Sequence, residues 1–142
     1  MSLHVPLYKR PTRSSLDPNI LGQLDRLAEA SGQDLVGQLA AMFVVDADAQ
    51  LIEMRRALDH ADAAAVARSA HNMKGASSTL GAIGLASLCA TLESESAEGI
   101  LANAESLLKA IGLEIGLVDG AFAERSAARS PGGEELAMAE TA

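Results

Sequence analysis

Four residues near the middle of the chain have types and a spacing that suit chemistry: His71, Lys74, Gly75 and Ser78. Steps of three, four and seven residues return to the same face of an α-helix, so we expect the four positions to share one stripe. A neutral imidazole is a nucleophile near pH 7 because its ordinary pKa is about 6.5, and a lysine ammonium attracts anions. The stripe therefore combines a nucleophile, a cation, a gap without a side chain and a hydroxyl.

The helix that carries this stripe is predicted over residues 63–80, with Asp62 as its N-cap. Apolar and small residues recur on one face of it, which we expect to be buried: Val66, Ala70, Met73, Ser77 and Leu80. His71 follows Ala70 by one position, which is about 100° around the helix. We therefore expect the histidine at the edge of the buried face, where a partner can reach it.

Four further segments show helical patterns. Asp17-Pro18 starts a helix, because an aspartate N-cap precedes a proline at the first helical position, and Ser31-Gly32 ends it. A long helix is expected over residues 33–58, another over residues 85–98 and a last one over residues 103–124.

Each of these four helices has apolar residues at helical spacing, which predict its buried face. They are Ile20, Leu21, Leu24 and Leu27 in the first; Leu35, Leu39, Met42, Phe43, Ala49, Ile52 and Leu58 in the second; Leu85, Leu88, Cys89 and Leu92 in the next; and Leu108, Ile111, Ile115, Val118 and Phe122 in the last. Residues 81–84 contain two glycines and are expected to form the turn before residue 85.

The helices together predict an all-α fold, an up-and-down four-helix bundle with an additional short N-terminal helix that caps one end. Residues 16–125 form this domain, without an internal repeat or a second domain. Residues 1–15 are expected to be a flexible basic arm, because they lack apolar periodicity and contain Lys9, Arg10 and Arg13. Residues 126–142 are expected to be a disordered acidic tail.

The composition limits the classes of function that are open to this chain. Only 2% of the residues are aromatic, and alanine and leucine dominate the apolar set, which favours helices over sheets. A formal net charge of −8 argues against a nucleic-acid-binding face. No run of about 18 apolar residues is present, so we expect no membrane span, and residues 1–13 lack the apolar stretch of a secretory signal. The single cysteine, Cys89, excludes an internal disulfide and suits the cytoplasm.

Neither a nucleotide site nor a metal site is indicated. The 142 residues contain no glycine-rich phosphate loop and leave no room for an ATP-binding kinase domain. Any phosphate that the chain handles must therefore come from a partner. His4 and His60 have no ligand-like partner at helical spacing, so we predict no bound metal and no other cofactor.

Residues 66–93 closely resemble the signature of histidine-containing phosphotransfer (HPt) domains. That pattern is His-x-x-Lys-Gly, then small residues, then Leu-Gly, then a leucine-rich helix. Here His71-Asn72-Met73-Lys74-Gly75-Ala76-Ser77-Ser78 is followed by Leu80-Gly81-Ala82 and by Leu85-Ala86-Ser87-Leu88-Cys89-Ala90-Thr91-Leu92-Glu93. The helices predicted over residues 17–124 also agree with the fold of that family.

The resemblance implies that His71 accepts a phosphoryl group from a receiver-domain phosphoaspartate, or from a kinase, and passes it to another receiver aspartate. The implied partners are response-regulator receiver domains and a hybrid sensor histidine kinase. The receiver's acidic residues would supply the Mg²⁺ that transfer needs. By its length the chain resembles the free-standing members, which are mostly monomers. We expect a cytoplasmic phosphorelay carrier and not an enzyme in the usual sense.

A carboxylate on the far ring nitrogen of His71 would fix its tautomer and stabilise the charge that develops as phosphorus bonds. Glu93, directly after Leu92, is the candidate for this orienting group, because HPt domains usually place Glu or Gln at the matching position.

The other residues of the stripe have roles that follow from their chemistry. Lys74 would neutralise the phosphoryl oxygens, and Gly75 would let a partner's backbone approach closely. A glycine inside a helix costs about 1 kcal/mol relative to alanine, and such local violations are typical of functional sites. Ser78 would donate a hydrogen bond to the phosphate, and Arg68, one turn before the histidine, would extend the positive stripe.

Three alternatives stay open. The dimerisation and phosphoacceptor domain of a sensor kinase also carries a reactive histidine, but an acidic residue and a nearby proline typically follow it. Here Asn72 follows, and no proline occurs between Pro18 and Pro131. A non-catalytic helical interaction module would be expected to lack His71 or Lys74, and a helical adaptor would carry the motif by coincidence.

Overall fold

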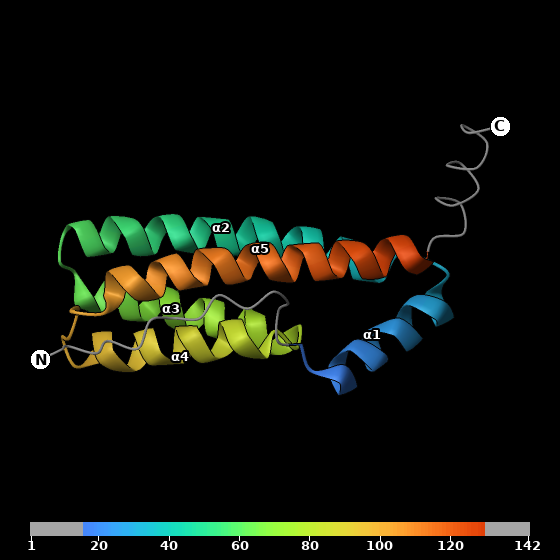
Figure 1. The fold of residues 1–142 in the computed structure, drawn as a ribbon, viewed down its shortest axis with the longest axis horizontal. Coiled ribbons are helices and arrows are strands. Elements are labelled where there is room, and N and C mark those ends of the chain that lie inside the picture. Colours follow the sequence, from blue (N-terminus) through green and yellow to red (C-terminus); the bar gives the residue numbers. More distant parts are fainter. Residues whose placement is uncertain (1–15, 130–142) are drawn as a thin grey trace, which may run out of the picture.

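The computed structural model describes residues 16–129 of the chain, and five helices lie in that range. They are α1 (Pro18–Ser31), α2 (Leu35–Asp59), α3 (Ala63–Thr79), α4 (Ile83–Ala97) and α5 (Ala104–Arg129), as Figure 1 shows. Each of the helices α2 to α5 packs against the next, and α2 also packs against α5, which closes the ring around one core. The predicted all-α four-helix bundle is confirmed. The predicted arm, residues 1–15, and residues 130–142 of the predicted tail lie outside the described residues.

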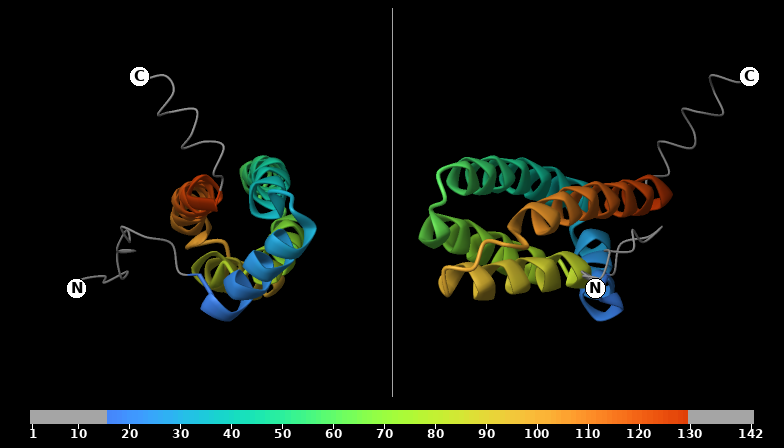
Figure 2. Two further views of the ribbon diagram at one scale, coloured as in Figure 1. Left: turned by 90° about the vertical axis from the view of Figure 1, so that its right-hand side faces the viewer. Right: turned by 60° about the vertical axis from the view of Figure 1, so that its left-hand side comes forward.

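Helix α1 lies across one end of the bundle, beside the turn between α3 and α4 (Figures 1 and 2). The Asp17 N–H donates a hydrogen bond of 2.7 Å to the Gly81 carbonyl. The guanidinium of Arg125 in α5 donates two hydrogen bonds to Asp25, of 3.1 and 2.6 Å, and this contact raises the pKa of Arg125. These contacts attach α1 to the turn and to α5, so it caps the bundle as predicted.

The connections between helices follow from aspartates and glycines in the sequence. Asp17, Asp34 and Asp62 are N-caps whose carboxylates each accept a hydrogen bond from a backbone N–H of the first turn. Gly81 has a φ of 75°, and a Cβ there would lie 3.0 Å from Cβ of Ile20. A side chain at this position would therefore strain the backbone and push α1 away from the turn.

Three helix boundaries differ from those predicted by two or more residues. α2 begins at Leu35 and not at residue 33, because Asp34 is its N-cap. α4 begins at Ile83, so residues 83 and 84 belong to the helix, and Gly81 alone supplies the reversal that was expected from both glycines. α5 continues to Arg129, so the predicted domain end at residue 125 lies too early. Residues 126–129 contain neither glycine nor proline, and the Ser126 hydroxyl donates a hydrogen bond to Asp34 at the start of α2.

The predicted buried faces of α3 and α5 are confirmed, and that of α4 nearly so. The buried residues are Val66, Ala70, Met73, Ser77, Leu80, Leu85, Cys89, Leu92, Leu108, Ile111, Ile115, Val118 and Phe122, whereas Leu88 is half-buried. Burial raises the pKa of the Cys89 thiol to about 12. The thiol therefore stays protonated at neutral pH and serves as a small apolar residue.

Helix α2 turns a different face to the core from the one predicted. Within the predicted stripe, Phe43 is buried, Leu35, Leu39 and Leu58 are half-buried, and Met42, Ala49 and Ile52 are exposed. The core face consists of Val36, Ala40, Phe43, Ala47, Met54 and Ala57. The prediction followed the large side chains, but alanines fill much of the close contact with the neighbouring helices. In α1, Leu27 is likewise exposed and the adjacent Ala28 is buried.

Among the residues that the structure describes, one helix, α2, has the length and the apolar composition needed to cross a membrane. The sequence prediction considered only uninterrupted apolar runs and therefore overlooked it. Core helices of soluble proteins pass the same test, and α2 packs against α3 and α5 in the bundle. This helix on its own does not indicate a membrane protein.

Candidate functional site

His71 and Glu93 come together on the surface formed by α3 and α4. The two helices are antiparallel neighbours joined by the short turn at Gly81, so residues 71 and 93 lie at the same level. The His71 side chain is 65% exposed, and its Nδ1 lies 2.7 Å from Oε2 of Glu93. The residues that were expected to interact are thus in hydrogen-bond contact.

This contact determines which ring nitrogen of His71 is available. An ionised carboxylate only accepts hydrogen bonds, so the Nδ1 atom must carry the proton that it donates to Glu93. In a neutral ring the lone pair then lies on Nε2. The exposed ring can present that nitrogen to an electrophile on another molecule.

Lys74 joins the same carboxylate from the other side. Its Nζ lies 2.6 Å from Oε1 of Glu93, and the two side chains are 35% and 26% exposed. The pKa of Glu93 is lowered, mainly by the hydrogen bond from Lys74 and further by the one from His71. Glu93 is therefore ionised at neutral pH and holds both neighbours. From the sequence, Lys74 was expected to bind a phosphate. Its ion pair with Glu93 was not predicted, although both residues were named as site residues.

Gly75 lies one residue further along α3 and is exposed. A Cβ built there would meet nothing within 4 Å, so no contact inside the described chain requires glycine at this position. Its carbonyl accepts a 3.0 Å hydrogen bond from the Thr79 hydroxyl. Sequence reasoning did not single out Thr79, although its place four residues after Gly75 is a spacing at which threonine bonds back to the helix.

Ser78 and Arg68 share the outward stripe of α3 but are not joined to the cluster of His71, Lys74 and Glu93. Both are exposed. Within residues 16–129 neither side chain makes a hydrogen bond or an ion pair. Their predicted roles therefore depend on a bound group or partner.

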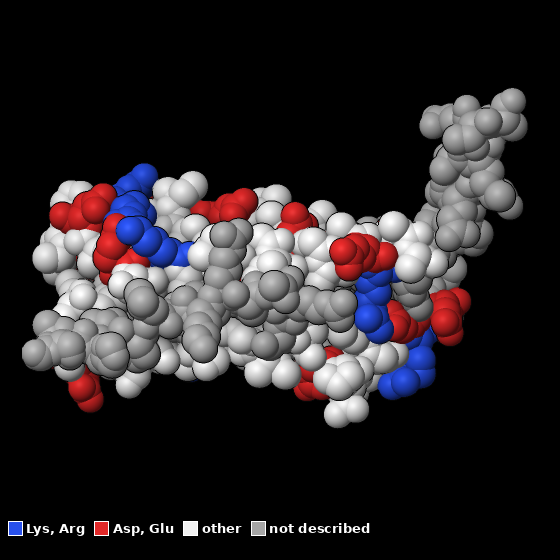
Figure 3. All heavy atoms as spheres, viewed as in Figure 1, with Lys and Arg blue, Asp and Glu red and all other residues white. Residues whose placement is uncertain are grey.

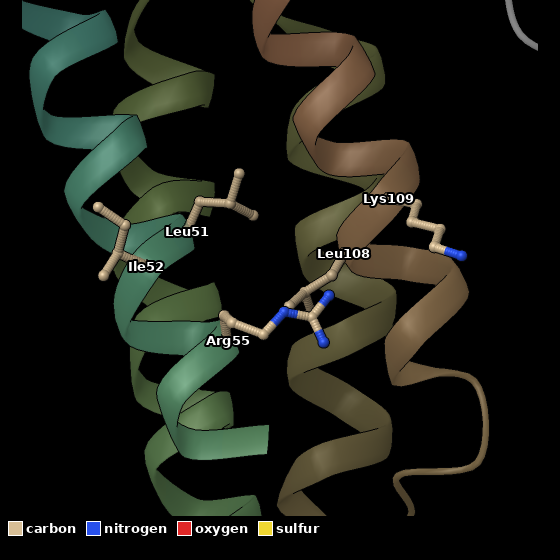
Figure 4. Close-up of a pocket in the computed structure, with 5 residues that line it drawn as sticks. All are labelled: Leu51, Ile52, Arg55, Leu108 and Lys109. Atoms are coloured by element: carbon tan, nitrogen blue, oxygen red, sulfur yellow. The ribbon is translucent and has the colours of Figure 1, made fainter. Parts of the chain in front are cut away.

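The site is an open surface and not a cavity. A shallow pocket lined by Leu51, Ile52, Arg55, Leu108 and Lys109 lies between α2 and α5, on another side of the bundle (Figure 4). In the described part of the chain no group of three or more His, Cys, Asp or Glu residues could hold a metal ion. The α3–α4 surface offers an exposed nucleophilic nitrogen, a fixed carboxylate and a cation. Such a set can take up an anionic electrophile that a partner carries.

Comparisons with known proteins agree with this arrangement. The model of the Hpt domain family matches residues 38–121. The crystal structure of histidine-containing phosphotransfer protein B (HptB) from Pseudomonas aeruginosa PAO1 aligns with a TM-score of 0.73 and 30% sequence identity, over 82% of this chain and 97% of that chain. No curated protein matches the chain. The matched family segment contains His71, Lys74 and Glu93.

Proposed function

The chain belongs to the histidine-containing phosphotransfer (HPt) domain family, and we propose from this membership that His71 is its phosphoacceptor. The chain takes part in histidine phosphotransfer within a two-component phosphorelay and interacts there with receiver domains and histidine kinases. The observation that carries the proposal is the 2.7 Å contact between Nδ1 of His71 and Glu93. It leaves Nε2 as the free nucleophile on an exposed ring.

In the proposed step the lone pair of Nε2 attacks the phosphorus atom of a receiver phosphoaspartate. The new P–N bond forms while the bond from phosphorus to the aspartate oxygen breaks, and the aspartate leaves as a carboxylate. The proton stays on Nδ1, so the ring becomes cationic, and Glu93 stabilises that charge through its hydrogen bond. Attack by the aspartate of another receiver then breaks the P–N bond and returns the ring to its neutral form.

Three neighbours have proposed roles toward the phosphoryl group. Lys74 neutralises the phosphoryl oxygens; its flexible stem lets the ammonium turn from Glu93 toward an arriving phosphate. Ser78 donates a hydrogen bond to the phosphate, and Arg68 extends the positive stripe. Support for these roles is their common face with His71 on α3, at helical spacing.

Gly75 is proposed to admit the receiver. A partner's backbone can come within van der Waals distance of a helix where a Cβ is missing, and the glycine has no packing role inside the described chain. A long side chain at residue 75 would cover the space next to His71.

We also propose that the chain is a cytoplasmic monomer that carries the group once per cycle, without the turnover of an enzyme. The Mg²⁺ that supports transfer is proposed to be held by acidic residues of the receiver, and the chain itself is proposed to hold no cofactor. A hybrid sensor kinase is the proposed source of the phosphoryl group.

The proposal is tested by incubating the chain with a phosphorylated receiver domain and scoring acid-labile, base-stable phosphate on the chain. Wild type is expected to become labelled and His71→Gln to remain unlabelled. His60→Gln is the matched control, because His60 is also exposed but lies at the end of α2. Label on His71→Gln equal to that on wild type would overturn the assignment.

A further inference from the structure

The outward side of α2 carries a line of apolar side chains that nothing in the described chain covers. We call Met42, Val45, Ala49 and Ile52 the α2 ridge. Its three large residues, Met42, Val45 and Ile52, are 64%, 69% and 60% exposed. Seven large apolar residues are exposed among the described ones, and three of the seven lie on this line. Exposed apolar residues that gather in this way mark interaction surfaces.

The spacing of the α2 ridge is that of a helix–helix seam. Its residues follow one another by three, four and three positions, which is the repeat along which two helices pack side by side. Gln38 and Arg56 continue the spacing by four positions at either end. The core residues of α2, such as Ala47 and Met54, lie on the opposite side of the helix. The bundle therefore does not use this seam.

The pocket between α2 and α5 does not supply the missing partner. In Figure 4, Leu51 and Arg55 point from α2 toward α5, whereas Ile52 points away from α5. Arg55 is already paired with Glu105 of α5, at 2.5 Å. Ile52 borders this pocket, but its side chain points away from α5, so α5 does not cover the α2 ridge.

Acidic side chains flank the α2 ridge on both sides. Asp46 and Glu53 follow one edge and Asp48 the other, by their positions around the helix. Residues 35–54 contain no lysine or arginine, and the first basic residues of α2, Arg55 and Arg56, are paired with Glu105 and Glu53. In Figure 3 the middle of the upper edge, over α2 and α5, shows acidic and uncharged atoms, whereas basic atoms lie toward the two ends. In paired helices the residues that flank the seam select the partner by charge.

This charge pattern decides between the possible occupants of the α2 ridge. A second copy of the chain on the ridge would bring acidic edges, with Asp46, Asp48 and Glu53, against acidic edges, and like charges at an interface are unfavourable. An amphipathic helix that binds a membrane surface is typically rich in lysine and arginine, whereas residues 35–54 of α2 contain none. A helix with lysine or arginine beside its apolar line meets the carboxylates with opposite charge.

We propose that the α2 ridge is a docking surface for one helix of another protein, with apolar residues at coiled-coil spacing and lysine or arginine beside them. The surface is separate from the phosphotransfer site, because His71 lies on α3 next to α4. A partner helix on α2 would therefore leave the histidine accessible to a receiver. The proposal is independent of the role assigned to His71.

The test uses two synthetic helical peptides of three heptads with leucine and isoleucine along the seam. One carries lysine at the flanking positions and the other carries glutamate. Binding to the full chain is measured by fluorescence anisotropy. We expect the lysine peptide to bind and the glutamate peptide to bind at least tenfold more weakly. The double variant Val45→Glu/Ile52→Glu is expected to bind the lysine peptide at least tenfold more weakly than wild type while keeping its helical circular dichroism.

Two controls separate docking from general attraction to an acidic protein. A scrambled lysine peptide of the same composition should not bind. The charge swap Asp46→Lys/Asp48→Lys should weaken binding of the lysine peptide and strengthen binding of the glutamate peptide. Glu98→Lys, at the end of α4, should change the binding of neither peptide. Equal binding of both peptides, or binding that Val45→Glu/Ile52→Glu leaves unchanged, would overturn the proposal. Sedimentation showing a dimer that this variant abolishes, or binding of wild type to lipid vesicles, would assign the ridge to a different occupant and overturn it as well.

Discussion

Two outward faces of the bundle, on α3 and on α2, are built from opposite kinds of residue. On α3 the outward stripe contains the exposed His71 and Gly75 and the half-buried Lys74, which are polar or small. On α2 the exposed ridge is apolar, with Val45 and Ile52 more than half exposed. Both faces have helical spacing and neither is covered within the described chain, so the difference lies in what each can offer to another molecule.

The contacts on each face show what that difference means. On the α3 side, Glu93 holds the histidine at 2.7 Å and the lysine at 2.6 Å, so reactive groups are fixed before a partner arrives. The α2 ridge offers only apolar surface area, with acidic side chains along its two edges. Transfer of a group needs positioned donors and acceptors, whereas docking of a helix needs area and a charge pattern that selects it. The first face is suited to chemistry and the second to attachment.

The largest effect should come from testing which side of α2 supports the fold. Phe43→Ala is expected to lower the free energy of unfolding by about 3–5 kcal/mol, because it empties a buried site. Met42→Ala, one residue earlier and 64% exposed, should change it by less than about 0.5 kcal/mol. Urea unfolding of the two variants measures both values. Equal losses would show that the ridge belongs to the core.

On the α3 face, removal of the orienting carboxylate should slow transfer from a receiver. Glu93→Ala loses both the hydrogen bond to His71 and the negative charge, and we expect transfer to slow by about 10- to 100-fold, the range for one hydrogen bond to a charged group. Glu93→Gln keeps an acceptor for Nδ1–H and should slow it less. Single-turnover transfer rates separate the two variants. If Glu93→Gln and Glu93→Ala slowed transfer equally, the carboxylate would not act by controlling the tautomer of His71.

Two glycines allow the faces to be compared with a matched substitution. A Cβ would meet nothing within 4 Å at Gly75 on α3 or at Gly116 on α5. Each glycine-to-alanine change should therefore stabilise the bundle by about 0.5–1 kcal/mol. Only Gly75→Ala should also slow transfer, because only that Cβ lies next to His71. Thermal unfolding and transfer rates are measured for both variants. Equal transfer rates for Gly75→Ala and Gly116→Ala would show that Gly75 has no role in docking.

The smallest effect should be a change in how stability depends on pH. Lys74 lowers the pKa of Glu93, so the ionised carboxylate favours the folded state. That contribution is present above the ordinary glutamate pKa of about 4.3 and is lost as the pH falls through the lowered value. Lys74→Met should therefore flatten the rise of stability with pH in the acid range, and Arg68→Met should not. The free energy of unfolding is measured at a series of acid pH values for wild type, Lys74→Met and Arg68→Met. The same slope against pH for all three proteins would show that the pair of Lys74 and Glu93 does not contribute.

Much of the fold and of the α3 face could be predicted from the sequence. In α3 the large apolar residues Val66 and Met73 occupy one side only, so the buried face and the outward position of His71 followed from spacing. Asp17 and Asp62 marked two helix starts, because an aspartate cap satisfies backbone groups locally, whereas the cap at Asp34 was not recognised. The pairing of Glu93 with the histidine required the resemblance to a family, since the residues lie on different helices.

The rest could not be predicted, for physical reasons. α2 has large apolar residues on two sides, and the core side is set by how closely α3 and α5 approach, which favours Ala40 and Ala47 over Ile52. Spacing along one helix cannot show that distance. The ion pair between Lys74 and Glu93 was missed for a related reason, because the carboxylate serves two partners only once α3 and α4 are side by side.

In the proposed phosphotransfer, Glu93 holds the proton on Nδ1 of His71 and leaves Nε2 to take the phosphoryl group. The most direct measurement is a ¹H–¹⁵N NMR spectrum of the ring nitrogens in the phosphorylated chain, with ³¹P coupling to identify the bonded atom. We predict phosphorus on Nε2 of His71 and a proton on Nδ1. Phosphorus on Nδ1, or on any residue other than His71, would show that Glu93 and His71 do not have these roles.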